Sequence, residues 1–238
     1  MTEAAKTPRE RYRQQIREEV KEKAWQQIAG SGASALSLNA IARQMGMSGP
    51  ALYRYFANRD ELITELVRDA YRSLADTFAA VGGAAAEATA PGTADGAEPA
   101  GPGLAALAGA LRDWAVADPH RYFLVYGTPV PGYRAPEDIT AIAAEMMSVL
   151  LDACAAVPPV SGGASPDGGI DEHLSEHRGW AATHPDLPPS ALRLALAFWS
   201  RLHGVLSLEL AGHFTGMGLD PARLFDAEVR ALTEGRAG

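Results

Sequence analysis

Apolar side chains recur along most of this chain at the three- and four-residue spacing of an amphipathic helix. The first such stretch covers residues 8–30, in which Ile16, Val20, Ala24 and Ile28 follow one another at four-residue intervals. No segment shows a convincing alternation of polar and apolar residues, which would mark a half-buried strand. The pattern predicts an all-α protein of about nine helices.

Two short helices joined by a tight turn are predicted over residues 37–56. Ser37 is a good N-cap for the first helix, because its hydroxyl can accept a hydrogen bond from an otherwise unpaired N–H group. Leu38 and Ile41 then lie on one apolar face. Gly46 follows where that helix should end, in a left-handed conformation that costs glycine little. This arrangement is typical of a domain that lays one helix in the major groove of DNA.

The second short helix is expected to begin after Ser48, whose side chain can cap it, with Pro50 near its start. Leu52 and Phe56 lie four residues apart and can pack back onto the first helix. An ordinary helical hairpin is the alternative interpretation. The agreement of caps, turn glycine and apolar spacing favours the DNA-binding motif.

The residues around these buried positions are the candidates for contact with DNA. Tyr53, Arg54 and Tyr55 are expected near the surface, where phenol and guanidinium groups can bind phosphate oxygens. Small residues such as Gly49 and Ala51 let the backbone approach the edges of bases. We therefore predict a DNA-binding surface on the second helix.

These residues also carry a resemblance to a known family. Residues 9–67 resemble the N-terminal domain of TetR/AcrR-family transcriptional regulators. The match includes the four apolar residues of the opening helix and Ala35-Leu-Ser-Leu38, Ile41-Ala42, Gly46, Ala51-Leu-Tyr-Arg-Tyr-Phe56 and Asn58-Arg-Asp-Glu-Leu62. The resemblance implies an all-helical homodimer that binds an inverted repeat in double-stranded DNA and is released by a small ligand.

By the same resemblance, two sets of residues would meet the DNA. The set expected at phosphates is Ser37, Ser48, Tyr53, Tyr55 and Arg59, and the set expected at bases is Gly49, Pro50 and Ala51. Arg43 and Arg54 complete the DNA-binding candidates. The family usually has lysine at the position of Arg59, and either residue keeps the positive charge.

The distribution of charge agrees with DNA binding, although the net charge of the whole chain is −8. Residues 1–60 hold 10 Lys and Arg against 6 Asp and Glu, whereas the remainder holds 11 against 23. Arg9, Arg11, Arg13 and Arg17 lie in the opening helix beside the motif. The alternative is a merely solvated basic face. Its position beside the motif favours contact with phosphates.

Residues 68–238 are predicted to form a helical ligand-binding and dimerisation domain. A helix starting at Asn58 or Asp60 should run into this domain and stop near Gly82-Gly83. Further helices are expected over 104–114, 119–127, 136–156, 190–214 (capped by Ser190) and 220–232. The tracts 82–103 and 157–189 are rich in Gly and Pro and are expected to be flexible.

The helix over 190–214 is apolar on most of its circumference, so it has to be covered on more than one side. We expect it to form a four-helix bundle with the last helix and the same two helices of a second subunit. The predicted dimer interface is Leu194, Phe198, Val205, Leu208, Phe225 and Val229.

A mostly apolar effector is expected in the second domain, because aromatic residues gather there with few charges. Trp199-Ser-Arg-Leu-His203-Gly204 is similar to the Trp…His-Gly pattern of one TetR C-terminal subclass. The candidate lining residues are Trp114, Tyr122, Phe123, Tyr126, Met146, Leu150, Trp199 and His203. The alternative is that each of them simply fills the core.

Other functional classes have little support in the sequence. There is no phosphate-cradling glycine loop and no nucleophile elbow, so an enzyme is not predicted. His173 and His177 have the spacing of metal ligands on a helix, but a solvated turn is favoured, and no metal or other cofactor is predicted. A single cysteine, Cys154, and the lack of a membrane-spanning run predict a cytoplasmic protein. A DNA-binding protein without a ligand is the competing class.

Overall fold

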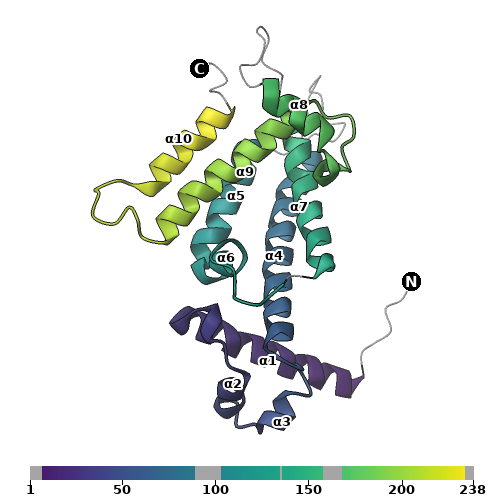
Figure 1. Cartoon of the computed structure of the whole chain (residues 1–238), viewed down its shortest axis with the longest axis vertical. Helices are drawn as coiled ribbons and strands as arrows, with labels where there is room; N and C mark the ends of the chain where they lie inside the picture. Colours follow the sequence, from purple (N-terminus) through teal and green to yellow (C-terminus); the bar gives the residue numbers. More distant parts are fainter. Residues whose placement is uncertain (1–6, 89–102, 135, 158–167, 234–238) are drawn as a thin grey trace. The chain divides into compact units, whose positions relative to one another are not determined.

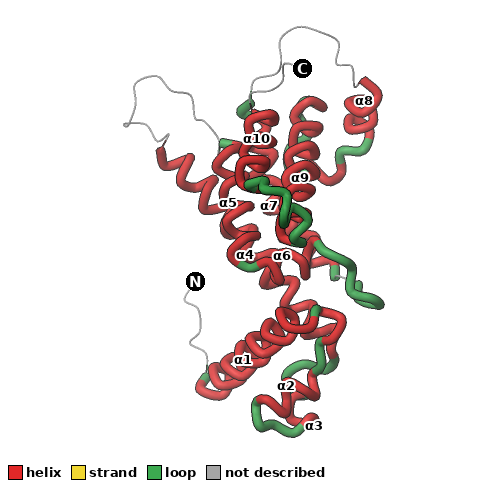
Figure 2. Tube along the Cα trace, turned by 90° about the vertical axis from the view of Figure 1, so that its left-hand side faces the viewer, coloured by secondary structure: helices red, strands yellow, loops and turns green. Residues whose placement is uncertain are grey.

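The structure, a computed structural model, describes residues 7–88, 103–134, 136–157 and 168–233. Ten α-helices and two short 3-10 helices make up this described part, which contains no strand (Figure 1; Figure 2). The predicted all-α fold is therefore confirmed, with one helix more than the nine expected.

The chain divides into two compact units, which we call the head and the body. The described residues of the head lie within Met1–Ala70 and His120–Ile139, and those of the body within Tyr71–Pro119 and Thr140–Gly238. The boundary predicted at residue 67 lies close to the end of the first segment. The segment His120–Ile139 was expected in the second domain, and its grouping with the head was not predicted.

The head contains the first three helices, the beginning of α4, and α6. The bounds are α1 Pro8–Ser31, η1 Ala33–Ala35, α2 Leu38–Gln44, α3 Gly49–Leu52, α4 Arg59–Ala88 and α6 Pro119–Tyr126. A capping box starts α1, because the Thr7 hydroxyl accepts from the Glu10 N–H at 3.3 Å and the Glu10 carboxylate accepts from the Thr7 N–H at 2.7 Å. The helix ends at Gly32, whose φ of +78° suits glycine.

The core of the head follows the predicted apolar spacing. Ile16, Val20, Ala24 and Ile28 of α1 are all buried. They share the core with Leu38, Ile41, Ala42, Leu52, Phe56, Leu62, Ile63, Leu66 and Val67. Full burial of one such aliphatic side chain stabilises the fold by about 1.5–3 kcal/mol. This core fixes the elements that surround the turn between α2 and α3.

Helix α4 passes from the head into the body. Asn58 is its N-cap, since its side-chain oxygen accepts from the Glu61 N–H at 2.8 Å. The predicted stop near Gly82-Gly83 is wrong, because α4 continues to Ala88. A Cβ on Gly82 would lie 3.4 Å from the Val149 side chain, which is ordinary van der Waals contact, so the fold does not require a glycine here. The alanines that follow are strong helix formers and extend the helix.

The body is built from the rest of α4 and the later helices. Their bounds are α5 Leu104–Ala117, α7 Glu137–Ala155, α8 Gly168–Glu176, η2 Gly179–Ala181, α9 Pro189–Leu210 and α10 Pro221–Thr233. Helix α9 packs against α10, α8 and α5. Arg201 of α9 pairs with Glu228 of α10 at 2.7 Å, and Arg193 of α9 pairs with Asp171 of α8 at 2.9 Å. In Figure 1, α9 and α10 lie side by side.

Two predictions for the second half of the chain need correction. The tract 157–189 contains α8 and η2, whose only buried side chains are Leu174 and Ala181, too few to produce a readable helical pattern. Ser190 is not a cap, because α9 begins at Pro189 with Pro188 before it. Parts of both predicted flexible tracts, residues 89–102 and 158–167, lie outside the described residues.

Candidate nucleic-acid interface

The turn between α2 and α3 is held by local hydrogen bonds that the sequence predicted. The Ser37 hydroxyl accepts from the Ala40 N–H at 3.3 Å, which confirms its role as the N-cap of α2. Gly46 has a φ of +66°, the left-handed conformation expected at the end of this helix. Its N–H and that of Met47 bind carbonyls in the last turn of α2, at 3.2 and 2.9 Å. The chain therefore turns sharply into α3.

Helix α3 is a single turn that separates buried from exposed side chains. Leu52 and Phe56 are fully buried, as the four-residue spacing predicted. Tyr53 is 43% exposed, Arg54 is exposed and Tyr55 is half-buried. The apolar positions anchor the turn in the core, so the phenol of Tyr53 and the guanidinium of Arg54 lie at the surface.

The start of α3 differs from the prediction in one contact. Ser48 is the N-cap residue by position, but its side chain makes no capping hydrogen bond. Gly49 has a packing reason for being small, since a Cβ there would lie 3.2 Å from the side-chain oxygen of Asn39 in α2. Pro50 is exposed and Ala51 is half-buried. Small side chains at the start of α3 therefore serve the contact between α2 and α3 as well as an approach to bases.

The predicted cations have different surroundings. Arg59 directs its guanidinium to the backbone, because one terminal nitrogen donates to the carbonyls of Ala33 and Ser34 at 3.0 and 3.3 Å. It therefore ties α4 to η1, a role that sequence reasoning missed. The Arg43 side chain is exposed, as is that of Arg54, and neither forms an ion pair within the described part of the chain. Contact of these two cations with phosphates stays a prediction, and their exposure is compatible with it.

The arginines of α1 were expected to form a phosphate-facing surface, and the structure gives two of them contacts within the head. Arg17 donates to the Tyr55 carbonyl, and its guanidinium carbon lies 4.2 Å from the centre of the Phe56 ring. Arg13 donates to the Arg54 carbonyl at 3.4 Å. Both arginines therefore contact the backbone of the turn that follows α3. Charge and spacing gave no signal for this, because the partners are backbone carbonyls.

Lys21 in α1 also forms ion pairs within the head. Its ammonium lies 2.7 Å from Asp69 and 2.8 Å from Glu18. Burial opposes the charge on Lys21, but the hydrogen bonds to Asp69 and Glu18 outweigh it and raise the pKa above its ordinary value. Lys21 is thus a charged link between α1 and α4.

Comparison with known proteins settles the family. The model of the N-terminal domain described as bacterial regulatory proteins of the tetR family matches residues 22–66. The model described as the tetracyclin repressor-like C-terminal domain matches residues 104–232, more than half of the chain. The chain belongs to the TetR family. It is accordingly a DNA-binding transcriptional regulator, and the helix-turn-helix predicted over 37–56 lies within the matched N-terminal domain.

Individual relatives agree with this membership. The HTH-type transcriptional regulators Rv1816 of Mycobacterium tuberculosis and Mb1846 of Mycobacterium bovis are each 37% identical to this TetR-family chain over 224 residues, 92% of each chain. The crystal structure of SCO4313 is 62% identical, with a TM-score of 0.79, and covers 95% of this chain and 98% of that chain. A protein of unknown function from Rhodococcus sp. RHA1 shares the fold at 20% identity, with a TM-score of 0.60 over 92% and 94% of the two chains.

The predicted effector-lining residues of this TetR-family protein do not gather in one unit. The head holds Tyr122, Phe123 and Tyr126, and the body holds Trp114, Met146, Leu150, Trp199 and His203. Four of the eight are core residues in this structure, namely Trp114, Tyr122, Met146 and Leu150. For these four, the core-filling alternative describes the conformation seen here.

Trp199 and His203 are half-buried on α9, with ring centres 4.3 Å apart. Burial lowers the pKa of His203 to about 4, so its imidazole is neutral at physiological pH. A neutral ring beside an indole suits contact with an uncharged molecule better than contact with an anion.

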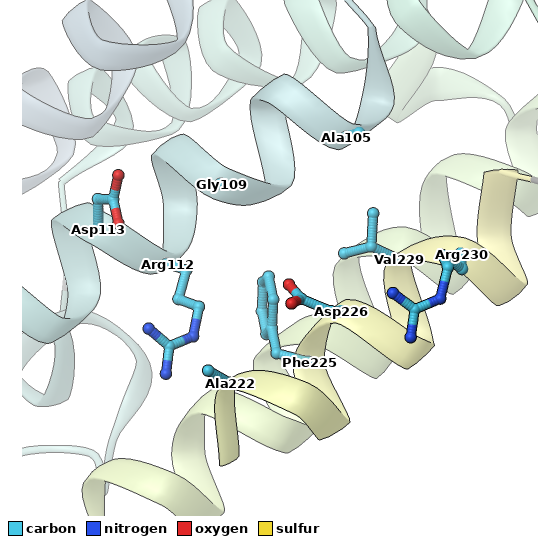
Figure 3. Close-up of a pocket in the computed structure, with 9 residues that line it drawn as sticks. All are labelled: Ala105, Gly109, Arg112, Asp113, Ala222, Phe225, Asp226, Val229 and Arg230. Atoms are coloured by element: carbon cyan, nitrogen blue, oxygen red, sulfur yellow. The ribbon is translucent and has the colours of Figure 1, made fainter. Parts of the chain in front are cut away.

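Each unit has a cavity. The head cavity has a volume of about 530 Å³. It is lined by residues 28–34 at the end of α1 and the beginning of η1, by His120, Phe123 and Leu124 of α6, and by residues 128–131. The body cavity, about 350 Å³, lies between α5 and α10, where Arg112 and Phe225 project into it (Figure 3). Phe123 is the only predicted effector residue that lines either of these two cavities.

The predicted dimer residues differ in burial, and two of them, Val205 and Val229, are half-buried. Leu194, Phe198 and Phe225 are buried at 6%, 1% and 1% exposure by their own protomer, so their side chains offer no surface to a partner. Leu208 is 45% exposed and is available for contact. Leu196 of α9 is also exposed, at 38%, but it was not among the residues predicted for the dimer interface. Residues of both apolar stripes of α9 are buried in the protomer, including Leu202 and Leu206 of the stripe that was assigned to the protomer core. The periodicity of the sequence shows both stripes but not how far the protomer's own helices cover each one.

Two further features concern other functional classes. No helix among the described residues is both long and apolar enough to span a membrane. His173 and His177 stack with ring centres 4.2 Å apart, and the described part of the chain contains no group of three or more potential ligand side chains that would suit a metal ion.

Proposed function

We propose that this protein is a repressor that binds an inverted-repeat operator as a homodimer and is released by a small, mostly apolar effector. The observation that carries the DNA-reading part is the anchoring of Leu52 and Phe56 in the core, with Tyr53 and Arg54 exposed on the same turn. A rigidly based, exposed turn of this kind can enter a major groove. Under the proposal, Tyr53, Arg54, Arg43 and Tyr55 bind phosphates and Pro50 and its neighbours face bases.

A homodimer is supported by the exposed apolar residues near α9 and α10. Leu196, Leu208, Met217 and Leu219 are between 38% and 65% exposed. Leu196 and Leu208 lie on α9, and Met217 and Leu219 lie in the segment between α9 and α10. Exposed apolar side chains on these neighbouring segments support an interaction surface here. A two-fold axis through this surface would present two recognition helices, and an inverted repeat matches that symmetry.

An effector is supported by the half-buried pair Trp199 and His203 and by the head cavity. The cavity volume of about 530 Å³ lies in the range of small-molecule sites. An effector weakens DNA binding only to the extent that it binds the DNA-incompetent state more tightly. The cytoplasm, where bacterial DNA lies, is the proposed location, and the buried free thiol of Cys154 suits its reducing conditions.

Enrichment of duplexes from a random-sequence DNA pool by the full-length protein tests the proposal. The expected product is an inverted repeat bound by two chains, with half-sites about one helical turn apart or a multiple of it. Fractionated extract of the source cells, added to this complex, should contain a fraction that releases the duplex. A complex that no fraction releases would favour the class of DNA-binding proteins without a ligand.

A further inference from the structure

Arg17 is largely covered and has several partners within the head, unlike an exposed arginine that is free to bind a phosphate. Its side chain is only 18% exposed, and the guanidinium stacks over the Phe56 ring at 4.2 Å. It donates to the Tyr55 carbonyl and faces two carboxylates of α4, Glu65 at 3.3 Å and Glu61 at 3.7 Å. Guanidinium has donors in a rigid planar fork, so one side chain can serve all these acceptors. Arg17 therefore joins α1, the end of α3 and the start of α4.

Helix α3 and the turn after it have little local stabilisation of their own. Helix α3 spans only Gly49–Leu52, and a single turn is an unfavourable helix without outside support. The Ser48 side chain provides no capping hydrogen bond at its start. In the turn that follows α3, the carbonyls of Arg54 and Tyr55 accept hydrogen bonds from Arg13 and Arg17, which lie one turn apart on α1. We call residues 49–56 the recognition turn, and its position depends on contacts from α1.

We propose that Arg17 is a positioning residue for DNA binding, which fixes the recognition turn against α1 and α4 without touching DNA itself. The inference rests on the proposed contacts of Tyr53 and Arg54 with DNA. Those two residues lie in the recognition turn, whose carbonyls Arg13 and Arg17 bind. Loss of the Arg17 contacts therefore lets Tyr53 and Arg54 move relative to the recognition turn of the second subunit. Specific binding needs both turns in register, whereas non-specific binding to phosphates does not.

The test measures the affinity of Arg17→Gln and Arg17→Lys for two probes across a range of salt concentrations. The probes are the enriched duplex and an unrelated duplex of the same length. We expect Arg17→Gln to bind the enriched duplex about tenfold more weakly or worse, because it loses hydrogen bonds made by a charged group. The unrelated duplex should be bound as before, and the salt dependence should keep its slope. Arg17→Lys should lose most of the same specificity, since an ammonium lacks the planar fork.

Three matched variants complete the experiment. Arg54→Gln should weaken binding to both duplexes and lower the salt slope by about one, as the loss of a phosphate contact does. Arg223→Gln removes the same charge from an exposed position on α10 and should leave both affinities unchanged. Glu65→Gln leaves Arg17 in place but removes one of its carboxylates, and should reduce specificity in the same direction. If Arg17→Gln does not fold, judged by its melting curve, Arg17→Lys and Glu65→Gln give the answer.

Two results with folded variants would overturn the positioning role alone. Unchanged affinity of folded Arg17 variants for the enriched duplex would show that the contacts of Arg17 have no part in reading DNA. Equal losses on both duplexes, with a salt slope lower by about one, would show that Arg17 binds a phosphate. A wild-type protein that enriches no duplex would contradict the proposed DNA reading itself, and the positioning role with it.

Discussion

Two adjacent residues of the recognition turn, Leu52 and Tyr53, have opposite surroundings. Leu52 is fully buried and Tyr53 is 43% exposed. This contrast separates what folds the head from what meets DNA. A substitution at each position should therefore affect a different measurement.

Tyr53→Ala should weaken binding to the enriched duplex while leaving the fold intact. The phenol is exposed, so the free energy of unfolding should change by no more than about 0.5 kcal/mol. Leu52→Ala is the opposite control and should lower that free energy by about 2–5 kcal/mol. Fluorescence anisotropy with labelled duplex and urea unfolding measure the two effects. Unaltered affinity of Tyr53→Ala would remove Tyr53 from the DNA-binding surface.

His203 makes the stability of the protein depend on pH. Its pKa is about 4 in the folded chain because of burial, against an ordinary value of 6.5. Between these values the unfolded chain binds a proton that the folded chain does not, so stability falls as pH is lowered through this window. The slope from this one group approaches about 1.4 kcal/mol per pH unit within the window, falls to about half of that at pH 6.5 and vanishes well above it.

Replacing His203 by Gln should flatten the pH dependence of unfolding between pH 6.5 and 4. Urea unfolding at a series of pH values measures it. His213→Gln, at an exposed position, should leave the dependence as in the wild type. A His203→Gln protein with the same pH dependence as the wild type would show that this imidazole titrates normally in the folded state.

At the scale of elements, the turn between α2 and α3 depends on one glycine. Gly46→Ala should lower the free energy of unfolding by about 1–2 kcal/mol, because its φ of +66° is unfavourable for a residue with a Cβ. Gly30→Ala is the matched control, in a helical position with open space around the added methyl, and should be neutral or stabilising. Thermal unfolding of both variants compares them. Equal effects would mean that the left-handed turn is not required.

Local signals predicted the elements well where capping, turn chemistry and apolar spacing coincide. The spacing of Leu52 and Phe56, the cap at Ser37 and the turn at Gly46 each produced the observed structure, because each depends on neighbours in the chain. Helix α8 was missed because it buries little. The roles of Arg17 and Arg59 were missed because their acceptors are backbone carbonyls far away in the sequence. Charge can be read from a sequence, but the partner of a charge cannot.

At the scale of the whole molecule, the proposed homodimer depends on a surface that the protomer leaves uncovered. Leu208→Glu should shift the protein from dimer to monomer in analytical ultracentrifugation, because a charge would be buried against the partner. Ile170→Glu on α8 has a similarly exposed position and should leave the mass unchanged. A Leu208→Glu protein that stays dimeric would place the interface elsewhere on the chain.

Under the proposed function, the α3 helices of two subunits enter major grooves on the same duplex. Methylation interference on the enriched duplex tests it most directly, since guanine N7 lies in the major groove and adenine N3 in the minor groove. We expect interference at guanine N7 in two symmetric clusters, one helical turn or a multiple of it apart. Interference confined to adenine N3, or a single unsymmetric cluster, would contradict it.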